Sequence, residues 1–260
     1  MIRKALLLSL ALTLCALAQP STHLVIVGGG NHPPAGVEKI YHWAGEKQAR
    51  LLVIPWATSE PDENFVEFSR DYQNLPLESI QRAPLAPLDP KSRALFLSQL
   101  EQATGVWFSG GDQVKIMEVL RDPELLEALR RKFAQGTVFS GTSAGCAIMS
   151  LRMLTGEGDV TLLDGRQIEL REGLGLLPPN VIVDQHFLKR QRENRLFGLI
   201  LENPDALGVG IDESTALVVT DGVEAEVVGE SQVMLVRRQE PNALKIWLFK
   251  PGQRFRLSDD

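Results

Sequence analysis

Short apolar runs alternate with amphipathic stretches along the first half of the chain. The apolar runs are almost continuous in hydrophobic residues and are bounded by glycine or proline; they cover residues 23–30, 50–56, 105–111 and 136–141. Strands that are covered on both faces have this pattern. The stretches between them have helical spacing and cover residues 35–46, 63–72, 90–103 and 123–135. The alternation predicts an α/β fold, with a mostly parallel sheet sandwiched by helices.

The second half of the chain has a different pattern. Another apolar strand is predicted at residues 180–185, followed by a helix over residues 188–201. The last third, which contains "ALVVTDGVEAEVVGESQVMLVRR", alternates apolar and polar residues around an Asp-Gly turn. This predicts antiparallel hairpins at the edge of the sheet. Because no repeat or linker interrupts residues 19–260, we expect a single domain.

The first residues have the features of a secretory signal peptide. Arg3 and Lys4 precede an apolar run over residues 5–17, and the small residues around Ala18 form an A-x-A cleavage site. The run is shorter than the roughly 20 residues that span a bilayer. Cys15 does not favour a lipid anchor, because leucine rather than a small residue precedes it. We therefore expect cleavage after Ala18 and a secreted or periplasmic protein with no membrane attachment.

Charge and cysteine content limit the possible partners. The formal net charge is −6, and removal of the leader makes the protein more acidic. Without lysine-rich tracts, it is a poor candidate for binding nucleic acid or an anionic membrane. After cleavage Cys146 is the remaining cysteine, so no internal disulfide is expected.

No metal or cofactor is expected from the motifs. No His/Cys cluster is present that would hold a metal. The glycines at residues 28–30 do not complete a dinucleotide fingerprint, because Pro33 stands where its third glycine belongs.

Residues 141–145 read Gly-Thr-Ser-Ala-Gly and fit the pattern G-x-S-x-G. In that pattern a strained turn between a strand and a helix exposes a serine hydroxyl, which makes Ser143 a candidate nucleophile. The alternative is a small-residue turn with no chemical role.

A serine nucleophile needs a base, and the chain has four histidines. His23, His32 and His42 lie in contexts typical of surface or packing histidines. His186 directly follows the apolar strand at residues 180–185, which places it at the carboxyl edge of the sheet with Ser143. The alternative for His186 is a cap of the next helix.

The acid that would orient the base is not settled by pattern. Asp212 and Glu213 follow a strand-like segment, and adjacent side chains on an extended chain point to opposite faces. One of the two should face the crevice, unless both belong to a solvated turn. The order serine, histidine, acid argues against a conventional α/β-hydrolase, in which the acid precedes the histidine.

Three arginines follow His186. Arg190, Arg192 and Arg195 are predicted early on the helix over residues 188–201, with Arg192 and Arg195 on one face. Because guanidinium groups clamp carboxylates, these side chains are candidates to anchor an acidic substrate. A solvated helix face is the alternative.

Several segments together resemble the cyanophycinase family. These are "FSGGDQ", "GTSAG", "VDQHFLKRQRENRL", "GIDESTA" and the closing "LFKPGQRFRL", in this order from about residue 24 to the end. The family consists of serine peptidases related to aspartyl dipeptidases, with a fold similar to class I glutamine amidotransferases. Its members often form homodimers.

The resemblance assigns roles that the pattern left open. It implies Ser143 as nucleophile, His186 as general base and Glu213 as orienting acid, with Asp212 facing away. It also implies a substrate pocket made of Gln113, Asp184, Gln185, Arg190, Arg192 and Arg195.

An acyl transfer also needs donors for its oxyanion, and backbone N–H groups usually supply them. Ala144, just after the serine, is one expected donor. Gly111, in a Gly-Gly turn at the end of another strand, is the other.

The implied substrate is cyanophycin, a poly-aspartate whose side chains carry arginine through isopeptide bonds. The implied product is the dipeptide β-Asp-Arg. Two alternatives remain at this point. One is an exported aspartyl dipeptidase with the same triad, and the other is a non-catalytic protein that binds acidic peptides.

Overall fold

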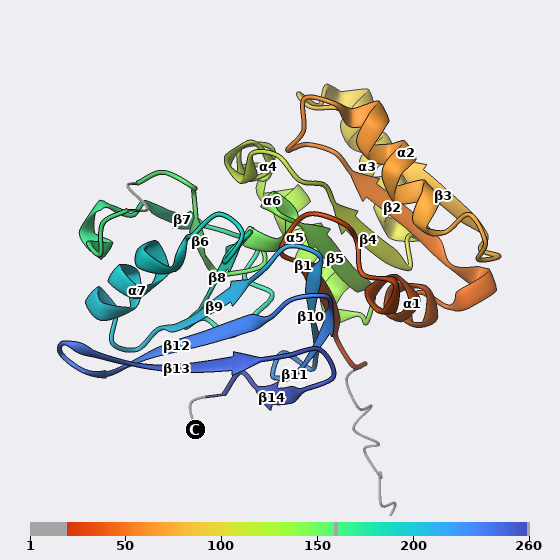
Figure 1. Ribbon diagram of the computed structural model, residues 1–260. Coiled ribbons are helices and arrows are strands. Elements are labelled where there is room, and N and C mark those ends of the chain that lie inside the picture. The colour runs from red at the N-terminus through yellow and green to blue at the C-terminus, as the bar shows by residue number, and fades with distance from the viewer. Residues whose placement is uncertain (1–19, 159–160, 259–260) are drawn as a thin grey trace, which may run out of the picture.

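An eight-stranded sheet forms the centre of the protein in the computed structural model, which describes residues 20–158 and 161–258 (Figure 1). In spatial order its strands are β14 (Arg254–Arg256), β11 (Glu224–Gly229), β10 (Thr215–Thr220), β1 (His23–Val27), β5 (Val138–Thr142), β4 (Gly105–Phe108), β2 (Arg50–Ile54) and β3 (Ser79–Arg82). The five neighbouring strands β1, β5, β4, β2 and β3 run parallel, whereas β10, β11 and β14 are antiparallel. The predicted α/β fold with a mostly parallel sheet is confirmed, and the predicted leader lies outside the described residues.

Helices cover both faces of the parallel strands. They are α1 (Pro34–Trp43), α2 (Pro61–Asp71), α3 (Pro90–Gln102), α4 (Gln113–Val119), α5 (Pro123–Ala134) and the short α6 (Ala144–Ala147), with a 3₁₀ turn η1 (Glu46–Gln48). The apolar sides of α1 and α2 pack on one face, and those of α3 and α5 pack on the other. Proline opens four of these helices, at a position where no backbone donor is needed.

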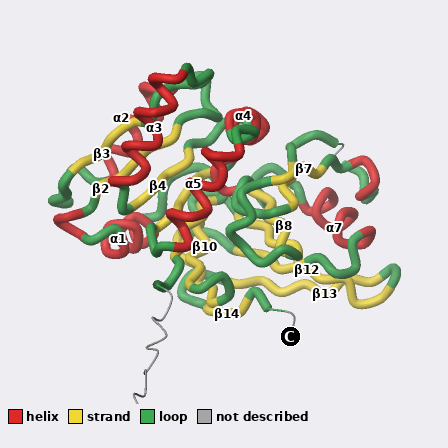
Figure 2. Tube along the Cα trace, turned by 180° about the vertical axis from the view of Figure 1, so that it is seen from behind, coloured by secondary structure: helices red, strands yellow, loops and turns green. Residues whose placement is uncertain are grey.

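A second sheet of four strands lies beside the first, on the side away from α1–α3 (Figures 1 and 2). Its order is β13 (Ala243–Phe249), β12 (Val233–Glu240), β9 (Leu207–Ile211) and β8 (Val181–Gln185). The helix α7 (Glu193–Glu202) covers it, together with η2 (Gly165–Gln167) and the small pair β6 (Arg152–Leu154) and β7 (Leu170–Glu172).

This second sheet corrects part of the sequence prediction. Residues 180–185 do form a strand, but it pairs with β9 rather than with the main sheet. Of the expected edge hairpins, β10–β11 extends the main sheet, whereas β12–β13 pairs with β9. Strands in the two sheets have similar burial patterns, so the pattern of a strand does not show which sheet it joins. The second sheet gives the apolar side of α7 a surface to pack against.

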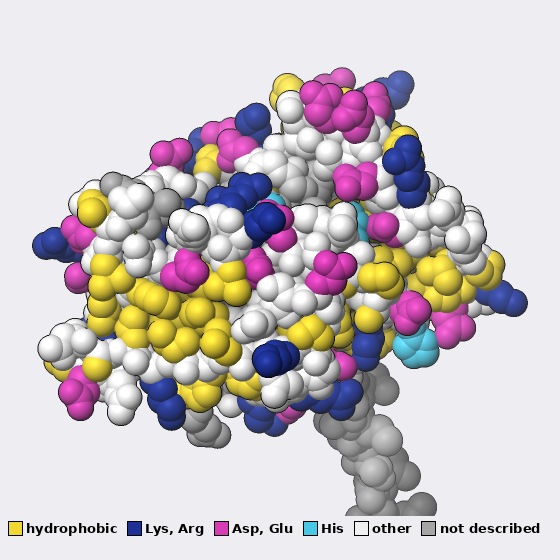
Figure 3. Space-filling model, in the orientation of Figure 1, with side chains coloured by type: hydrophobic (Ala, Val, Ile, Leu, Met, Phe, Trp, Pro, Cys, Tyr) yellow, Lys and Arg dark blue, Asp and Glu magenta, His cyan; other side chains and the backbone are white. Residues whose placement is uncertain are grey.

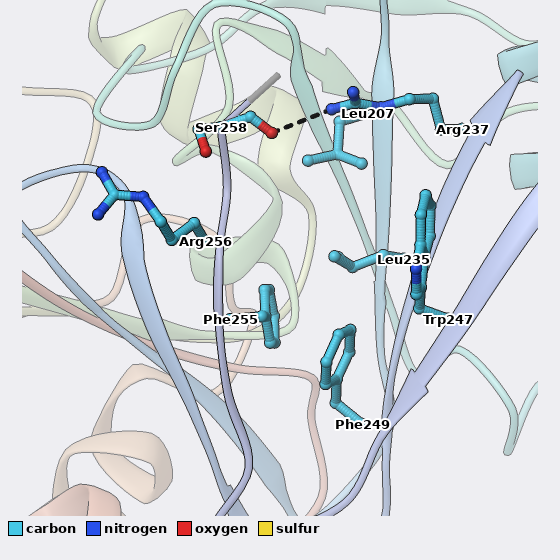
Figure 4. A pocket seen from close by; sticks show the side chains of 8 residues that line it. All are labelled: Leu207, Leu235, Arg237, Trp247, Phe249, Phe255, Arg256 and Ser258. Atoms are coloured by element: carbon cyan, nitrogen blue, oxygen red, sulfur yellow. Dashed lines mark hydrogen bonds between the residues drawn. The ribbon is translucent and has the colours of Figure 1, made fainter. Parts of the chain in front are cut away.

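The end of the chain joins the two sheets. Phe255 of β14 stacks on Phe249 of β13, with ring centroids 4.1 Å apart. The two rings border a pocket of about 310 Å³ that also contains Leu235 and Trp247, and Arg237 closes its rim with a hydrogen bond to the Ser258 carbonyl (Figure 4). Within the described residues, no helix is both long and apolar enough to cross a membrane.

Candidate active site

Ser143 lies at a sharp turn between β5 and α6. Its backbone is in a strained region, with φ +52° and ψ −107°. The glycines on either side of this turn make it possible, because another part of the backbone lies close to the Cα atom of each glycine. A Cβ at Gly141 would lie 2.7 Å from the backbone of Gly145, and one at Gly145 would lie 2.2 Å from the carbonyl of Phe108. The G-x-S-x-G segment therefore forms the predicted strand-to-helix turn.

A chain of hydrogen bonds links Ser143 to His186 and Glu213. The Nε2 atom of His186 lies 2.8 Å from Oγ of Ser143. Its Nδ1 atom lies 2.6 Å from Oε1 of Glu213. This geometry suits a serine whose proton is taken by an imidazole that a carboxylate orients. The structure thus brings together the three residues that the sequence suggested.

The environment of His186 favours its neutral form. Burial lowers the pKa of the ring from the ordinary value of 6.5, and the neighbouring charges of Arg190 and Arg192 lower it further. The hydrogen bond that the ring donates to Glu213 opposes this and raises the pKa, but the net direction is downward. At neutral pH the ring is therefore free to accept a proton.

Asp212 does not contact the histidine. Its carboxylate accepts hydrogen bonds from the backbone N–H of Lys189 at 2.9 Å and from the Ser231 hydroxyl at 2.7 Å. The two acids point to opposite sides, as the extended segment predicts. Asp212 ties the turn after His186 to the segment that carries Glu213.

Gly111 and Ala144, the predicted oxyanion donors, lie in two turns near the serine. Ala144 follows Ser143 at the start of α6, and a Cβ at Gly110 would lie 3.4 Å from Cβ of Ser143. The Gly110–Gly111 turn therefore faces the serine. Across the described part of the chain, the N–H groups of Gly111 and Ala144 have no protein acceptor.

The two glutamines of the predicted substrate pocket are buried. Gln113 begins α4 and donates from Nε2 to the carbonyl of Leu154 at 2.8 Å. Gln185 ends β8 beside His186, and its Oε1 is buried with no hydrogen-bond partner among the described residues. Gln185 thus has a buried carbonyl oxygen without a partner in the described part of the chain, one residue before His186.

The arginines do not form one exposed cluster. Arg190 is half-exposed, with Nε 3.8 Å from Oε1 of Glu213. Arg192 is mostly buried and donates to the carbonyl of Gln185 at 2.8 Å, and burial lowers its pKa to about 10. Arg195 is fully buried and pairs with Asp184. A direct clamp by Arg195 on a substrate is therefore a wrong expectation.

The helix predicted over residues 188–201 also begins later than expected. Residues 188–192 form a turn, in which the N–H of Arg190 bonds the carbonyl of His186 and the N–H of Arg192 bonds that of Phe187. Gln191 has φ +52°, so α7 starts at Glu193. Arg192 and Arg195 accordingly do not share an exposed helix face.

Sequence reasoning missed the residues that hold these groups in place. Ser231 lies outside the quoted segments, and Ser214 lies inside "GIDESTA" without a role assigned to it; the signal that could have found them is their place in turns at strand ends. The glycines at residues 28–30 complete no nucleotide motif, and Gly29 and Gly30 lie directly against His186 and Glu213.

An α/β fold with a serine at a strand-to-helix turn and a histidine in reach of it is typical of serine hydrolases. Comparison with known proteins makes this chain a serine-type peptidase. Residues 24–227 match the model of peptidase family S51, and the chain belongs to that family. The family resemblance seen in the motifs is confirmed.

The curated relatives include proteins named cyanophycinase and proteins named peptidase E. The chain is 32% identical to a cyanophycinase of Trichormus variabilis (strain ATCC 29413 / PCC 7937), covering 91% of this chain and 86% of the relative. It is 30% identical to a cyanophycinase of Geminocystis herdmanii (strain PCC 6308), covering 83% and 80%. A peptidase E of Actinobacillus pleuropneumoniae serotype 7 (strain AP76) is 27% identical, covering 74% and 80%.

Solved structures support the fold. A crystal structure of a peptidase from an acI-B1 Actinobacterium superposes with a TM-score of 0.68 at 24% identity, covering 92% of this chain and 97% of that one. A putative peptidase E from Listeria monocytogenes EGD-e gives a TM-score of 0.56 at 13% identity, covering 81% and 98%.

Proposed function

We propose that this serine-type peptidase is an exported enzyme that hydrolyses cyanophycin to β-Asp-Arg dipeptides. The observation that carries the proposal is the hydrogen-bonded chain of Ser143, His186 and Glu213 beside Gln185 and the arginine turn. The similarity to cyanophycinases over most of both chains supports it.

Ser143 is the nucleophile in this proposal. His186 takes the proton from Oγ as it attacks the carbonyl carbon of an aspartyl residue, and Glu213 holds the ring with Nε2 toward the serine. The N–H groups of Gly111 and Ala144 donate to the oxyanion, where the loss of one donor costs about 3–4 kcal/mol of barrier.

Collapse of this intermediate breaks the C–N bond, and His186 passes its proton to the leaving amine. A water molecule then attacks the ester on Ser143, with His186 again taking a proton. The acid product leaves and the serine regains its hydrogen.

The charges around the serine suit a zwitterionic substrate. Arg190 and Arg192 bear positive charge close to the triad and would attract a free carboxylate of the aspartyl unit. The unused Oε1 of Gln185 is an acceptor for a guanidinium or amide N–H. Asp184 and Arg195, buried as a pair, support this wall and do not touch the substrate.

Export rests on the leader at residues 1–18. Cleavage after Ala18 would leave a mature protein that begins with Gln19. The intact mass and N-terminal sequence of protein recovered from the periplasm or medium test this, and a protein that keeps Met1 inside the cell would contradict it.

The decisive assay separates the substrates. Residues 19–260 are incubated with insoluble cyanophycin and, in parallel, with Asp-X dipeptides, with Ser143→Ala as the control. Release of β-Asp-Arg by the wild type alone supports the proposal. Cleavage of the dipeptides without clearing of the polymer would make the protein an aspartyl dipeptidase. Binding of acidic peptides without any hydrolysis would make it a binding protein.

We also propose that the protein forms homodimers. Figure 3 shows hydrophobic side chains gathered over the hairpin β12–β13, where Ile246 and Leu248 are exposed on β13. As the edge strand of its sheet, β13 also has a free backbone edge. Apolar side chains on an edge strand favour burial against a second copy.

A further inference from the structure

The end of β1 contacts every segment that carries a member of the proposed triad. Three successive carbonyl groups, those of residues 27–29, each accept one hydrogen bond from a different turn. In order, these bonds run from Ser143 N–H to Val27 O (3.0 Å), from His186 N–H to Gly28 O (2.6 Å) and from Ser214 N–H to Gly29 O (2.7 Å). Ser214 directly follows Glu213, so one strand end holds all three turns.

The three donor residues all have a positive φ angle. Ser143, His186 and Ser214 have φ values of +52°, +50° and +53°. Residues with a Cβ rarely have φ in this range, because the side chain crowds the backbone. Such a conformation persists where the surroundings hold it, and here each strained residue is held by one of the three bonds.

The glycines of this strand end leave space for the same segments. A Cβ at Gly28 would lie 2.3 Å from the carbonyl oxygen of Asp212, and one at Gly30 would lie 3.2 Å from Cβ of Glu213. At Gly29, which has φ +117°, a Cβ would lie 2.1 Å from Cε1 of His186 and 2.6 Å from its Nε2. The imidazole ring therefore occupies the space that a side chain at residue 29 would fill.

We propose that residues 27–30 are the positioning segment of the active site, and that Gly29 sets the place of the His186 ring. The segment acts through its three carbonyl groups and through the absent side chain of Gly29. Gly29 has no side chain of its own and acts through the ring of His186, so it is a positioning residue. The inference rests on the proposed roles of Ser143 and His186 and adds a residue that those roles do not include.

Gly29→Ala tests the inference, and Gly45→Ala is the matched control. Gly45 also has a left-handed backbone, with φ +101°, but the nearest atom to its added Cβ is 3.9 Å away. The two changes impose a similar backbone penalty. With a small neutral ester, Gly29→Ala should lower kcat by about 100-fold or more, because the ring is displaced by roughly an ångström. KM should change little, and Gly45→Ala should keep the wild-type kcat.

A double variant separates positioning from general loss of stability. In a His186→Ala background the methyl group that Gly29→Ala adds has room, because the ring is gone. Gly29→Ala should then lower Tm much less than it does in the wild type, so the two effects should be non-additive. If Gly29→Ala alone does not fold, the double variant should fold. Equal losses of Tm in both backgrounds, or a double variant that does not fold, would overturn the inference.

Labelling of the serine with a fluorophosphonate separates this inference from the proposed function. Wild type should label, Ser143→Ala should not, and Gly29→Ala should label about 100-fold more slowly. If Ser143→Ala keeps its activity and its labelling, the proposed function fails. If Ser143→Ala is inactive while Gly29→Ala labels and turns over at the wild-type rate, the positioning inference alone fails.

Discussion

The guanidinium of Arg195 lies in the protein interior and makes two hydrogen bonds to the carboxylate of Asp184. The side chains are 1% and 0% exposed. Asp184 also accepts a hydrogen bond from the backbone N–H of Gln185, one residue before His186. A pair with this degree of burial has a structural role behind Gln185 and His186.

The first prediction concerns this ion pair. Arg195→Ala leaves the buried Asp184 without its partner, and removal of one member of a buried pair typically costs about 3–5 kcal/mol. Urea unfolding should show this loss. Arg190→Ala is the control, because a half-exposed side chain should change stability by no more than about 0.5 kcal/mol. Similar stabilities for the two variants would contradict the structural role of Arg195.

Ser143→Ala should abolish hydrolysis. Loss of a serine nucleophile lowers kcat on the order of a million-fold, and the small side chain leaves the fold intact. Turnover of a neutral ester and the circular dichroism spectrum measure the two effects. A folded variant with near wild-type turnover would make the turn at residues 141–145 a structural feature only.

Glu213→Gln should reduce turnover far more than Asp212→Asn. Glu213 bonds the ring of His186 directly, and a comparable change of an orienting acid costs on the order of 10⁴-fold in kcat. Asp212 bonds Lys189 and Ser231 instead, so its change should mainly lower stability. Steady-state kinetics of both variants decide the matter, and the reverse ranking would assign the orienting role to Asp212.

The pH dependence should follow the pKa of His186. The neutral ring is the base, so kcat/KM should fall as the pH drops through this pKa, which lies below 6.5 because of burial. Arg190 and Arg192 lower this pKa further and Glu213 raises it. Arg190→Ala should therefore move the acidic limb to higher pH. The shift should shrink when salt is added, since Arg190 is half-exposed. A limb that moves to lower pH would argue against His186 as the base.

The homodimer can be tested on β13. Ile246→Glu and Leu248→Glu place charges on the exposed side of the edge strand and should convert a dimer to monomer in light scattering. Lys245→Glu lies on the opposite side of the same strand and serves as the control. A wild-type protein that is monomeric at all concentrations would contradict the proposed assembly.

The sequence by itself determined four of the five parallel strands of the main sheet, β1, β2, β4 and β5, and the candidate nucleophile at the end of one of them. Near-continuous apolar runs predict buried parallel strands, and proline or an N-capping aspartate marks helix starts such as those at Pro90 and Pro123. The G-x-S-x-G pattern reflects local backbone geometry, so five residues are enough to identify Ser143 as a candidate nucleophile. His186 could be found because the chain has few histidines.

Tertiary structure alone decided which side chains meet. The bonds that hold Ser143, His186 and Ser214 come from residues 27–29, more than 100 residues away in the chain, and no local pattern records them. The same holds for the choice between Asp212 and Glu213, because alternation gives opposite sides but not which side faces the histidine. Arg195 has the sequence context of a surface helix, yet it is buried, because α7 packs against β9 and β12 and the guanidinium pairs with Asp184 of β8. Secondary-structure propensity acts over a few residues, whereas the burial of a side chain and its hydrogen-bond partners depend on how distant segments of the chain pack.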